Sequence, residues 1–502
     1  MHNGCVNGHG EAAVLGIDLG TSGVKVLVTT PDGDVLGRAS AGYPVRVPAP
    51  GRAEADPCDW WAATRRAVHA ALADARLVGA GSVDCGLGWD GQRRLTVTGL
   101  AVAGQMHGVV LVDDRGAALR PAILWPDQRA TAEVALYQEL PCDYTAPLRN
   151  RPSPGMAGPL LCWLATPEPH TLRCSWWALQ PKDWLRLRLT GQAATDPTDA
   201  SGTLMFDLAR DAWAEPLIDK LGLPRDKLPP VMRSAETAGP LLPGPAVDLG
   251  LPRDKLPPVR RPAEIAGGLL PGPAAELGLD QGIPVAVGAG DTAAALYAAG
   301  LRPDEAMLTL GSGGQWVVPV PSPEGEQAVA TNLYRAVGDG YYRLAPVQNV
   351  GITLDWVRNL LGATWEELYA TAARPPRPDL ADHLALRFDP HLTPERWNPG
   401  AAGAWTGLTL AHEREDLMRS ALDGVANLLR RRLDDLRAAG HAPRRAILGG
   451  GGTSHPAWRA LLEETLGLPL APAPASWLTP AGAARLAAHT ISPGRCARAG
   501  PA

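Results

Sequence analysis

The sequence has few cysteines, few aromatic residues besides tryptophan, and no long apolar run. Its 502 residues include seven cysteines, two phenylalanines and eight tyrosines, against sixteen tryptophans. The cysteines are far apart, and neither a Cys-x-x-Cys pair nor a His-Glu-x-x-His string occurs, which argues against a disulfide framework and a standard zinc site. No window of about eighteen consecutive apolar residues is present, so no membrane-spanning helix is expected.

An excess of positive charge is also lacking. The net charge is −5 and the pI is about 6.1, so there is no basic field to attract nucleic acid or an anionic membrane. The first twelve residues lack a basic region followed by an apolar run, so we interpret them as a disordered leader and not as a secretory signal. We therefore expect a cytoplasmic protein with reduced thiols, and neither nucleic acid nor a membrane as a partner.

The residues that are present suit a globular protein of about two to four domains. Apolar runs at residues 14–18 and 24–28 flank a glycine loop at 20–23, which predicts a strand–loop–strand hairpin, and a third strand is expected from residue 35. The pattern recurs with apolar runs at 306–310 and 316–320 around a GSGG loop at 311–314. Two such hairpins indicate a duplicated α/β architecture with a cleft between its halves.

Three further segments complete this outline. Helical spacing of apolar residues predicts a helix over residues 60–77 with Asp59 as its N-cap. A strand is expected over 95–103, leading directly into the string GQMHG at 104–108. A third glycine run at 449–452 lies between a predicted strand at 445–448 and a predicted helix at 456–466, an order that lets a nucleotide bind against a helix N-terminus.

One segment of the chain is present twice. Residues 222–249 and 250–277 differ at six of 28 positions and are rich in proline. Two copies are too few for a stable solenoid, which needs about three or more units. We therefore interpret the second copy as a recent tandem duplication that forms an extra surface loop, with a functional insert as the alternative.

The first glycine loop and the carboxylate before it have the chemistry of a phosphate site. Glycines let backbone N–H groups approach phosphate oxygens, and the hydroxyls of Thr21 and Ser22 add donors. Asp18 stands where it could hold a magnesium–phosphate group, directly or through water. The alternative is an ordinary glycine hairpin. No Walker string is present, so a phosphate cradle here is of another kind.

Two further residues are candidates for chemistry at strand ends. Asp291 follows the apolar run 283–287 and could accept the proton of an attacking hydroxyl during phosphoryl transfer. A helix N-cap is the equally good structural alternative. His107 could hydrogen-bond a polyol hydroxyl, although a buried histidine with satisfied hydrogen bonds is the commoner case.

Several strings occur in the order and spacing of one known family, and the chain resembles the FGGY carbohydrate kinases over residues 13–488. This family is a branch of the actin-like ATPase fold. Within it the string GQMHG is similar to that of the members acting on D-xylulose and different from that of glycerol kinases. The resemblance rests mainly on GIDLGTSGVKV (16–26), GQMHG (104–108), PKDWLRLRLTG (181–191), GAGDTAAA (288–295), LTLGSGG (308–314) and LGGGGTSHPAWR (448–459).

The resemblance implies two ribonuclease H-like domains facing each other across a cleft. A sugar-binding domain is expected at 13–287, a nucleotide-binding domain at 288–490 and a short irregular tail at 491–502. The implied reaction is ATP-dependent phosphorylation of D-xylulose to D-xylulose 5-phosphate, with Mg²⁺ as cofactor, sugar and ATP as partners, and a homodimer as the candidate assembly. The implied roles are Asp291 as base, Asp18 as a catalytic carboxylate and Mg²⁺ ligand, Met106, His107, Asp291 and Thr292 as sugar contacts, and Gly20, Thr21, Ser22, Gly311, Ser312, Gly313, Gly450 and Gly451 as nucleotide contacts.

The chain departs from the family pattern at several positions. Thr292 stands where the D-xylulose branch commonly has asparagine, Pro126 replaces a hydrogen-bond donor, and Leu160 replaces a lysine. The tail after Thr490 is also short. Two other functions therefore stay open: a kinase for a related ketose or polyol such as ribulose or gluconate, and a member that binds nucleotide or sugar without turnover.

Overall fold

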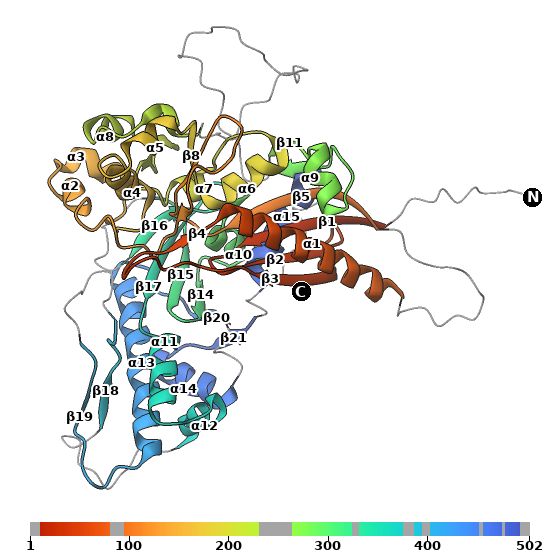
Figure 1. Ribbon diagram of the computed structural model, residues 1–502. Helices are drawn as coiled ribbons and strands as arrows, with labels where there is room; N and C mark the ends of the chain where they lie inside the picture. The colour runs from red at the N-terminus through yellow and green to blue at the C-terminus, as the bar shows by residue number, and fades with distance from the viewer. Residues whose placement is uncertain are drawn as a thin grey trace, which may run out of the picture.

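The computed structural model describes residues 11–80, 95–229, 264–323, 331–374, 386–393, 402–450, 455–473 and 477–491. Two sheets with helices packed on them dominate the described part of the chain (Figure 1). Four expectations fall wholly or mostly outside it: the leader, the duplicated segment (230–263), Gly451 and the tail (492–502).

The first sheet combines an antiparallel hairpin with parallel strands. β1 pairs antiparallel with β2 and parallel with β5, which in turn pairs with β12 and β13. The hairpin and the third strand predicted at the start of the chain are confirmed. In spatial order the strands are β11 (Ile265–Gly268), β12 (Pro284–Ala286), β5 (Leu95–Gly104), β1 (Glu11–Leu19), β2 (Gly23–Thr29) and β3 (Val35–Gly42), with β13 (Ala289–Gly290) beside β5.

The second sheet begins with the same hairpin pattern. β14 pairs antiparallel with β15 and parallel with β20, so the predicted repetition of the opening motif is confirmed. Its order is β16 (Asn332–Arg335), β17 (Tyr341–Val347), β15 (Gly314–Val320), β14 (Glu305–Leu310), β20 (Arg445–Gly449) and β21 (Leu470–Pro472). Four two-stranded pairs complete the strands: β4 (Glu54–Ala55) with β7 (Ala122–Ile123), β6 (Val110–Val112) with β8 (Trp177–Leu179), β9 (Phe206–Asp207) with β10 (Ala212–Trp213), and β18 (Arg387–Asp389) with β19 (Ala404–Thr406).

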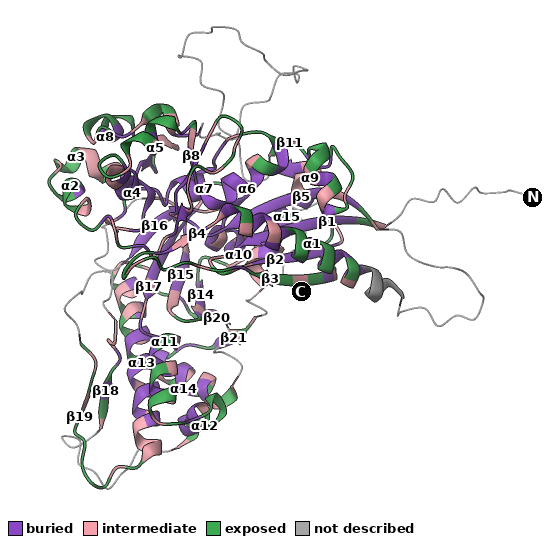
Figure 2. Cartoon of the chain, viewed as in Figure 1, coloured by how far each residue is buried: buried purple, intermediate pink, exposed green. Residues whose placement is uncertain are grey.

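Several helices pack on these two sheets, and their outer faces are exposed while the central strands of the sheets are buried (Figure 2). No helix within the described residues is both long and apolar enough to cross a membrane. The helices are α1 (Pro57–Ala80), α2 (Val134–Gln138), α3 (Cys142–Thr145), α4 (Ala157–Leu164), α5 (Pro169–Cys174), α6 (Pro181–Thr190), α7 (Pro197–Ala200), α8 (Glu215–Lys220), α9 (Pro271–Leu277), α10 (Asp291–Ala299), α11 (Gly351–Leu360), α12 (Trp365–Ala370), α13 (Arg414–Ala438), α14 (Pro456–Leu466) and α15 (Leu478–Ile491), with short 3-10 turns η1 (Ala146–Leu148), η2 (Arg225–Lys227) and η3 (Thr371–Ala373).

The start of α1 differs from the expectation. The helix begins at Pro57, so Asp59 lies inside the first turn and is not the N-cap. Asp56 takes that role, because its carboxylate accepts a hydrogen bond from the backbone N–H of Cys58 at 2.9 Å. Proline is favoured at the first helical position, which explains the earlier start. The predicted helix over 456–466 is confirmed with the same bounds as α14.

Alternation along β1 sends its side chains to two different cores. Leu15, Ile17 and Leu19 join the core under α1, whereas Val14 belongs to the core formed with α10 and α15. That second core also contains Tyr342 and other residues of β14–β17, so it joins the two sheets. The segment expected as the second domain begins with β13, which lies in the first sheet, so this segment contributes strands to both sheets. The expected domain boundary at residue 288 stays a prediction.

Candidate active site

Three parallel strands of the first sheet end side by side. In the register of the sheet Asp18 lies beside Ala103, and Ala103 lies beside Ala289. The residues after these strand ends therefore meet at one edge of the sheet, and they include the sequence candidates at 105–107 and at 291. The sheet brings together candidates that are far apart in the chain.

Asp18 is a buried carboxylate with one cation near it. It is 5% exposed and faces the side of β1 covered by α15, opposite the α1 face. Lys25, its neighbour across the hairpin, places Nζ 3.9 Å from Oδ2. Burial raises the pKa of Asp18 to about 7; the charge of Lys25 opposes this rise and the charge of Asp291 adds to it. The carboxyl groups of Asp18 and Asp291 are therefore close enough to influence each other electrostatically.

The first glycine loop is held by its own backbone and by three side chains. The N–H of Gly20 donates to the carbonyl of Gly23 at 3.0 Å, which closes the turn. The Gly20 carbonyl accepts from the hydroxyl of Tyr43 and from Nε2 of Gln105. Trp125 Nε1 donates to Thr21 Oγ1 at 2.9 Å. The loop is therefore fixed before any ligand binds.

Asp291 is the first residue of α10, and Gly290 is the N-cap. The structural alternative, in which Asp291 is the N-cap of this helix, is therefore wrong. Its Oδ1 accepts from the N–H of Thr292 at 2.5 Å and from the Thr292 hydroxyl at 3.1 Å, while Oδ2 has no hydrogen-bond donor among the described residues. Burial raises the pKa of Asp291, opposed by the hydrogen bonds from Thr292 and the charge of Lys25. One oxygen is thus fixed, and the other can accept a proton.

Met106 lies against the residue before Asp291, and His107 follows Met106 in the chain. A Cβ added to Gly290 would lie 2.9 Å from Met106 Sδ, so the two segments touch. His107 has a φ of 75°, a left-handed conformation that costs about 1–2 kcal/mol for a residue with a Cβ. Its N–H donates to Gln180 Oε1 at 2.9 Å, and its ring Nδ1 donates to the Gly202 carbonyl at 2.6 Å. In the neutral tautomer with its proton on Nδ1, Nε2 is the acceptor nitrogen of the ring.

The second sheet reaches this group of residues through two tyrosines. Tyr342 donates to Met106 Sδ at 3.6 Å, and the rings of Tyr334 and His107 are 5.8 Å apart. Both tyrosines lie more than two hundred residues along the chain from the strand end that they contact. Sequence reasoning missed them, and neither residue carries a local signal. It also missed Lys25, although pairing the predicted hairpin places that residue opposite Asp18.

The nucleotide-side candidates gather at the ends of β14 and β20. Gly450 has a φ of 105°, and a Cβ there would lie 1.9 Å from the Leu310 carbonyl, so only glycine fits. Gly313 packs on the carbonyl of Val347, and the carbonyl of Ser312 accepts from the N–H of Ile352 at 2.8 Å. The structure therefore brings Gly311–Gly313 and Gly450 to one edge of the second sheet.

A cavity of about 800 Å³ opens beside this second loop. Gly311 and Ser312 are among the residues that line it. The lining also includes aromatic rings: Tyr369 stacks on Trp365 with ring centroids 5.4 Å apart and on Trp458 at 6.2 Å. An apolar aromatic wall next to a glycine loop suits a planar base beside a phosphate chain.

A divalent cation fits the surroundings of Asp18. The carboxylate is buried, and no described residue donates a hydrogen bond to it, because Lys25 lies beyond hydrogen-bond distance. Mg²⁺ prefers one or two carboxylates with waters completing the shell. The residues present therefore suit that ion without a dedicated protein cage.

The departures from the family pattern have local structural outcomes. Leu160 is fully buried in an apolar core beneath α4, where a lysine would need a partner. Thr292 is 7% exposed, and its hydroxyl is engaged with Asp291. Its expected contact with the sugar stays a prediction.

Comparison with known proteins gives the family. The model of the FGGY family of carbohydrate kinases matches with its N-terminal domain at residues 13–252 and 246–298 and with its C-terminal domain at 306–491. The overlap of the two N-terminal pieces falls where the tandem copies meet, as expected for a stretch present twice.

Curated and solved relatives agree with this match. A xylulose kinase of Escherichia coli (strain K12) is 32% identical over 95% of this chain and 90% of its own length, and one of Streptomyces coelicolor is 30% identical over 95% and 88%. The solved structure of a xylulose kinase from Rhodospirillum rubrum superposes with a TM-score of 0.77 at 27% identity, covering 96% of this chain and 91% of that one. A xyloylose kinase from Brucella ovis gives 0.80 at 28% identity, with coverage of 96% and 91%. The fold is the two-domain actin-like ATPase fold, and the chain belongs to the FGGY family of carbohydrate kinases.

Proposed function

We propose that the protein phosphorylates D-xylulose with ATP to give D-xylulose 5-phosphate and ADP. The carrying observation is the placement of Asp291, which has one carboxylate oxygen held by Thr292 and the other able to receive a proton. The residue before it, Gly290, touches Met106, and its own carboxylate lies within electrostatic reach of Asp18. The relatives named xylulose kinases support this choice of sugar over ribulose or gluconate.

Each candidate residue has a defined task in this reaction. Asp291 takes the proton of the terminal hydroxyl as that oxygen attacks the γ-phosphorus in line. His107 and Met106 bind and orient the ketose beside it. The N–H groups of Gly20 and Gly311 close their own turns, so backbone N–H groups of residues 21–23 and 312–313 hold phosphate oxygens, and Gly450 borders the nucleoside. Asp18 would hold Mg²⁺, which when bound supplies positive charge to the phosphates.

The test is a coupled ADP-release assay with D-xylulose, D-ribulose, gluconate and glycerol, with product identity from phosphorus NMR. We expect phosphorylation of D-xylulose at its 5-hydroxyl. The Asp291→Asn variant should lose about 10²- to 10⁴-fold in kcat and should bind Mg·ADP as tightly as the unmodified chain. The matched control is Asp280→Asn, an exposed carboxylate that should leave kcat unchanged.

Two results would contradict the proposal separately. Turnover of ribulose or gluconate without turnover of xylulose would show that the sugar is wrong. A kcat retained in the Asp291→Asn variant would show that another group accepts the proton.

A further inference from the structure

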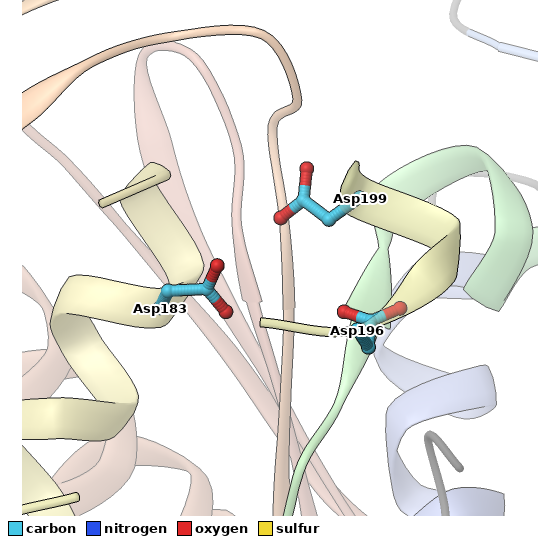
Figure 3. A group of neighbouring side chains, drawn as sticks. All are labelled: Asp183, Asp196 and Asp199. Carbon is cyan, nitrogen blue, oxygen red and sulfur yellow. The ribbon is translucent and has the colours of Figure 1, made fainter. Parts of the chain in front are cut away.

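A charged cluster with no exposed side chain lies beside the expected sugar site. Lys182, on α6, is 0% exposed, and its Nζ lies 2.5 Å from Asp183 Oδ1, 2.7 Å from Asp196 Oδ2 and 3.3 Å from Asp199 Oδ2. The three carboxylates converge on one point (Figure 3). Arg186 adds a second cation through Asp183 at 3.0 Å. Burying a charge costs free energy unless the charge is paired, so the stability of each of these groups depends on its partners in the cluster.

Lys182 already provides a cation to the three carboxylates of the cluster. The three aspartates could by their spacing hold a metal ion, since their oxygens lie within 4.8 Å of one another. The ammonium of Lys182 contacts all three. Burial disfavours the charged form of Lys182, but the three carboxylates outweigh burial and raise its pKa above the usual value. The cluster is therefore an internal ion network and not an empty metal site.

One branch of the network leads to the expected base. The hydroxyl of Thr198 donates to Asp196 Oδ1 and accepts from the backbone N–H of Gly290 at 2.9 Å. Gly290 is the N-cap of α10 and the residue before Asp291. Thr198 is 0% exposed, so water does not compete for either bond. The chain Lys182–Asp196–Thr198 thus fixes the backbone on which Asp291 sits.

A second branch leads to His107. Gln180 lies just before α6; its Oε1 accepts from the His107 N–H, and its Nε2 donates to the carbonyl of Asp199 at 3.1 Å. The Gly202 carbonyl, just after α7, accepts from the His107 ring. The left-handed backbone of His107 is therefore held by the two short segments that carry the charged cluster.

We propose that Lys182, Asp196 and Thr198 position the Asp291 carboxylate, and that Gln180, bonded to the backbone of the same cluster, positions the His107 ring, in the relative placement that phosphoryl transfer to the sugar requires. The inference rests on the proposed function for its kinetic readout. The network acts through Asp291 and His107 and contacts neither sugar nor nucleotide. One ion network would thereby set both the base and the sugar contact, although the two come from different strands.

The test removes the link without changing the charges. In Thr198→Val the Gly290 N–H loses its acceptor and Asp196 loses a donor, whereas Thr198→Ser retains both bonds. We expect Thr198→Val to lower kcat about 10- to 100-fold while the Kd of Mg·ADP is unchanged, and Thr198→Ser to recover most of the rate. In an Asp291→Asn background the valine change should lower the residual rate by less than about twofold, because the link acts through Asp291.

The chain offers a matched control next to this link. Thr195 is 1% exposed beside the same cluster, and its hydroxyl has no hydrogen-bond partner among the described residues. Thr195→Val should leave kcat unchanged. Hydrogen exchange of the peptide containing the Gly290 amide gives a readout that needs no substrate: exchange should accelerate at least about tenfold in Thr198→Val but not in Thr195→Val or Thr198→Ser.

The outcomes separate the two proposals. If the unmodified chain does not act on D-xylulose, the proposed function fails, and the exchange of the Gly290 amide still tests the link. If Thr198→Val retains both kcat and amide protection, the positioning role is wrong and the kinase activity stands. If the valine and serine variants lose activity equally with a collapsed unfolding midpoint, the residue serves folding alone and the inference is overturned.

Discussion

Asp18 shows how a site residue can weaken the fold that carries it. Its carboxylate is 5% exposed, and its nearest cation is 3.9 Å away. In the folded chain its pKa is about 7, whereas an unperturbed aspartate titrates near 3.8. Folding therefore takes up a proton between these pH values, and stability falls as the pH rises through this window. Below pH 4 both states are protonated, and the penalty disappears.

The Asp18→Asn variant should reveal this penalty directly. Without Mg²⁺ and nucleotide we expect its free energy of unfolding to exceed that of the unmodified chain by about 2–4 kcal/mol at pH 8, and by almost nothing near pH 4. Urea unfolding at both pH values measures the difference, with the exposed Asp280→Asn as the control. An equal gain at both pH values would show that the charge of Asp18 is not the cause. The same variant should lose kinase activity, since it removes the carboxylate expected to hold the cation.

The structure contains the helices and hairpins that a local sequence pattern predicted. Contacts between segments that are distant in the chain were not predicted. Apolar alternation with glycine loops identified both hairpins, and helical spacing with a proline start gave α14 its bounds. The Asp291 and Gly450 segments were found because small residues after a buried strand leave a distinctive pattern. By contrast, the contacts of Tyr334, Tyr342 and Lys182 depend on packing between segments that no local pattern connects.

The packing of α15 on the first sheet is a feature of element packing that the sequence alone does not predict. A Cβ added to Gly482 would lie 1.9 Å from the carbonyl of Ala294 in α10, and a Cβ on Gly16 of β1 would lie 2.0 Å from that of Pro480. Glycines on a helix and on a strand thus allow three backbones to approach. Each glycine alone would be interpreted from sequence as a weak point in its element.

Alanine at position 482 should therefore be poorly tolerated. We expect Gly482→Ala to lower the free energy of unfolding by about 1–3 kcal/mol, since backbone atoms must shift to admit the methyl group. Gly272→Ala is the matched control, because Gly272 also lies in a helix, α9, but a Cβ there meets nothing within 4 Å. That change should alter the free energy of unfolding by less than about 1 kcal/mol, because helix propensity favours alanine while the following Pro273 restricts a residue that has a Cβ. A neutral Gly482→Ala in chemical unfolding would contradict the close approach.

At the scale of the whole molecule the tandem copies contribute unequally. The start of the first copy forms η2, and the end of the second copy forms β11 and α9. The described elements thus use no part of the repeated sequence twice, while residues 230–263 between them lie outside the described part of the chain. One composite copy therefore accounts for all of the described elements in this region.

Removing 28 residues, 230–257, should leave the protein intact. Pro229 then joins Pro258, one uninterrupted copy of the sequence remains, and six of the 34 intervening positions are retained before Glu264. We expect an unchanged thermal unfolding midpoint and an unchanged kcat, because no described element is shortened. A deletion of equal length that removes residues 264–291 should unfold the chain by deleting β11 to β13. Loss of activity in the first variant with the fold preserved would instead assign the extra copy a function.

The position of α15 also bears on how the protein is made. This helix, at residues 478–491, covers β1 at residues 11–19 and β5 at 95–104. During synthesis β1 and β5 emerge from the ribosome several hundred residues before the helix that covers one of their faces. At about 5–20 residues per second that apolar face stays uncovered for tens of seconds. The N-terminal sheet is thus completed late in translation, and until then its open face is the surface on which a nascent-chain chaperone would act.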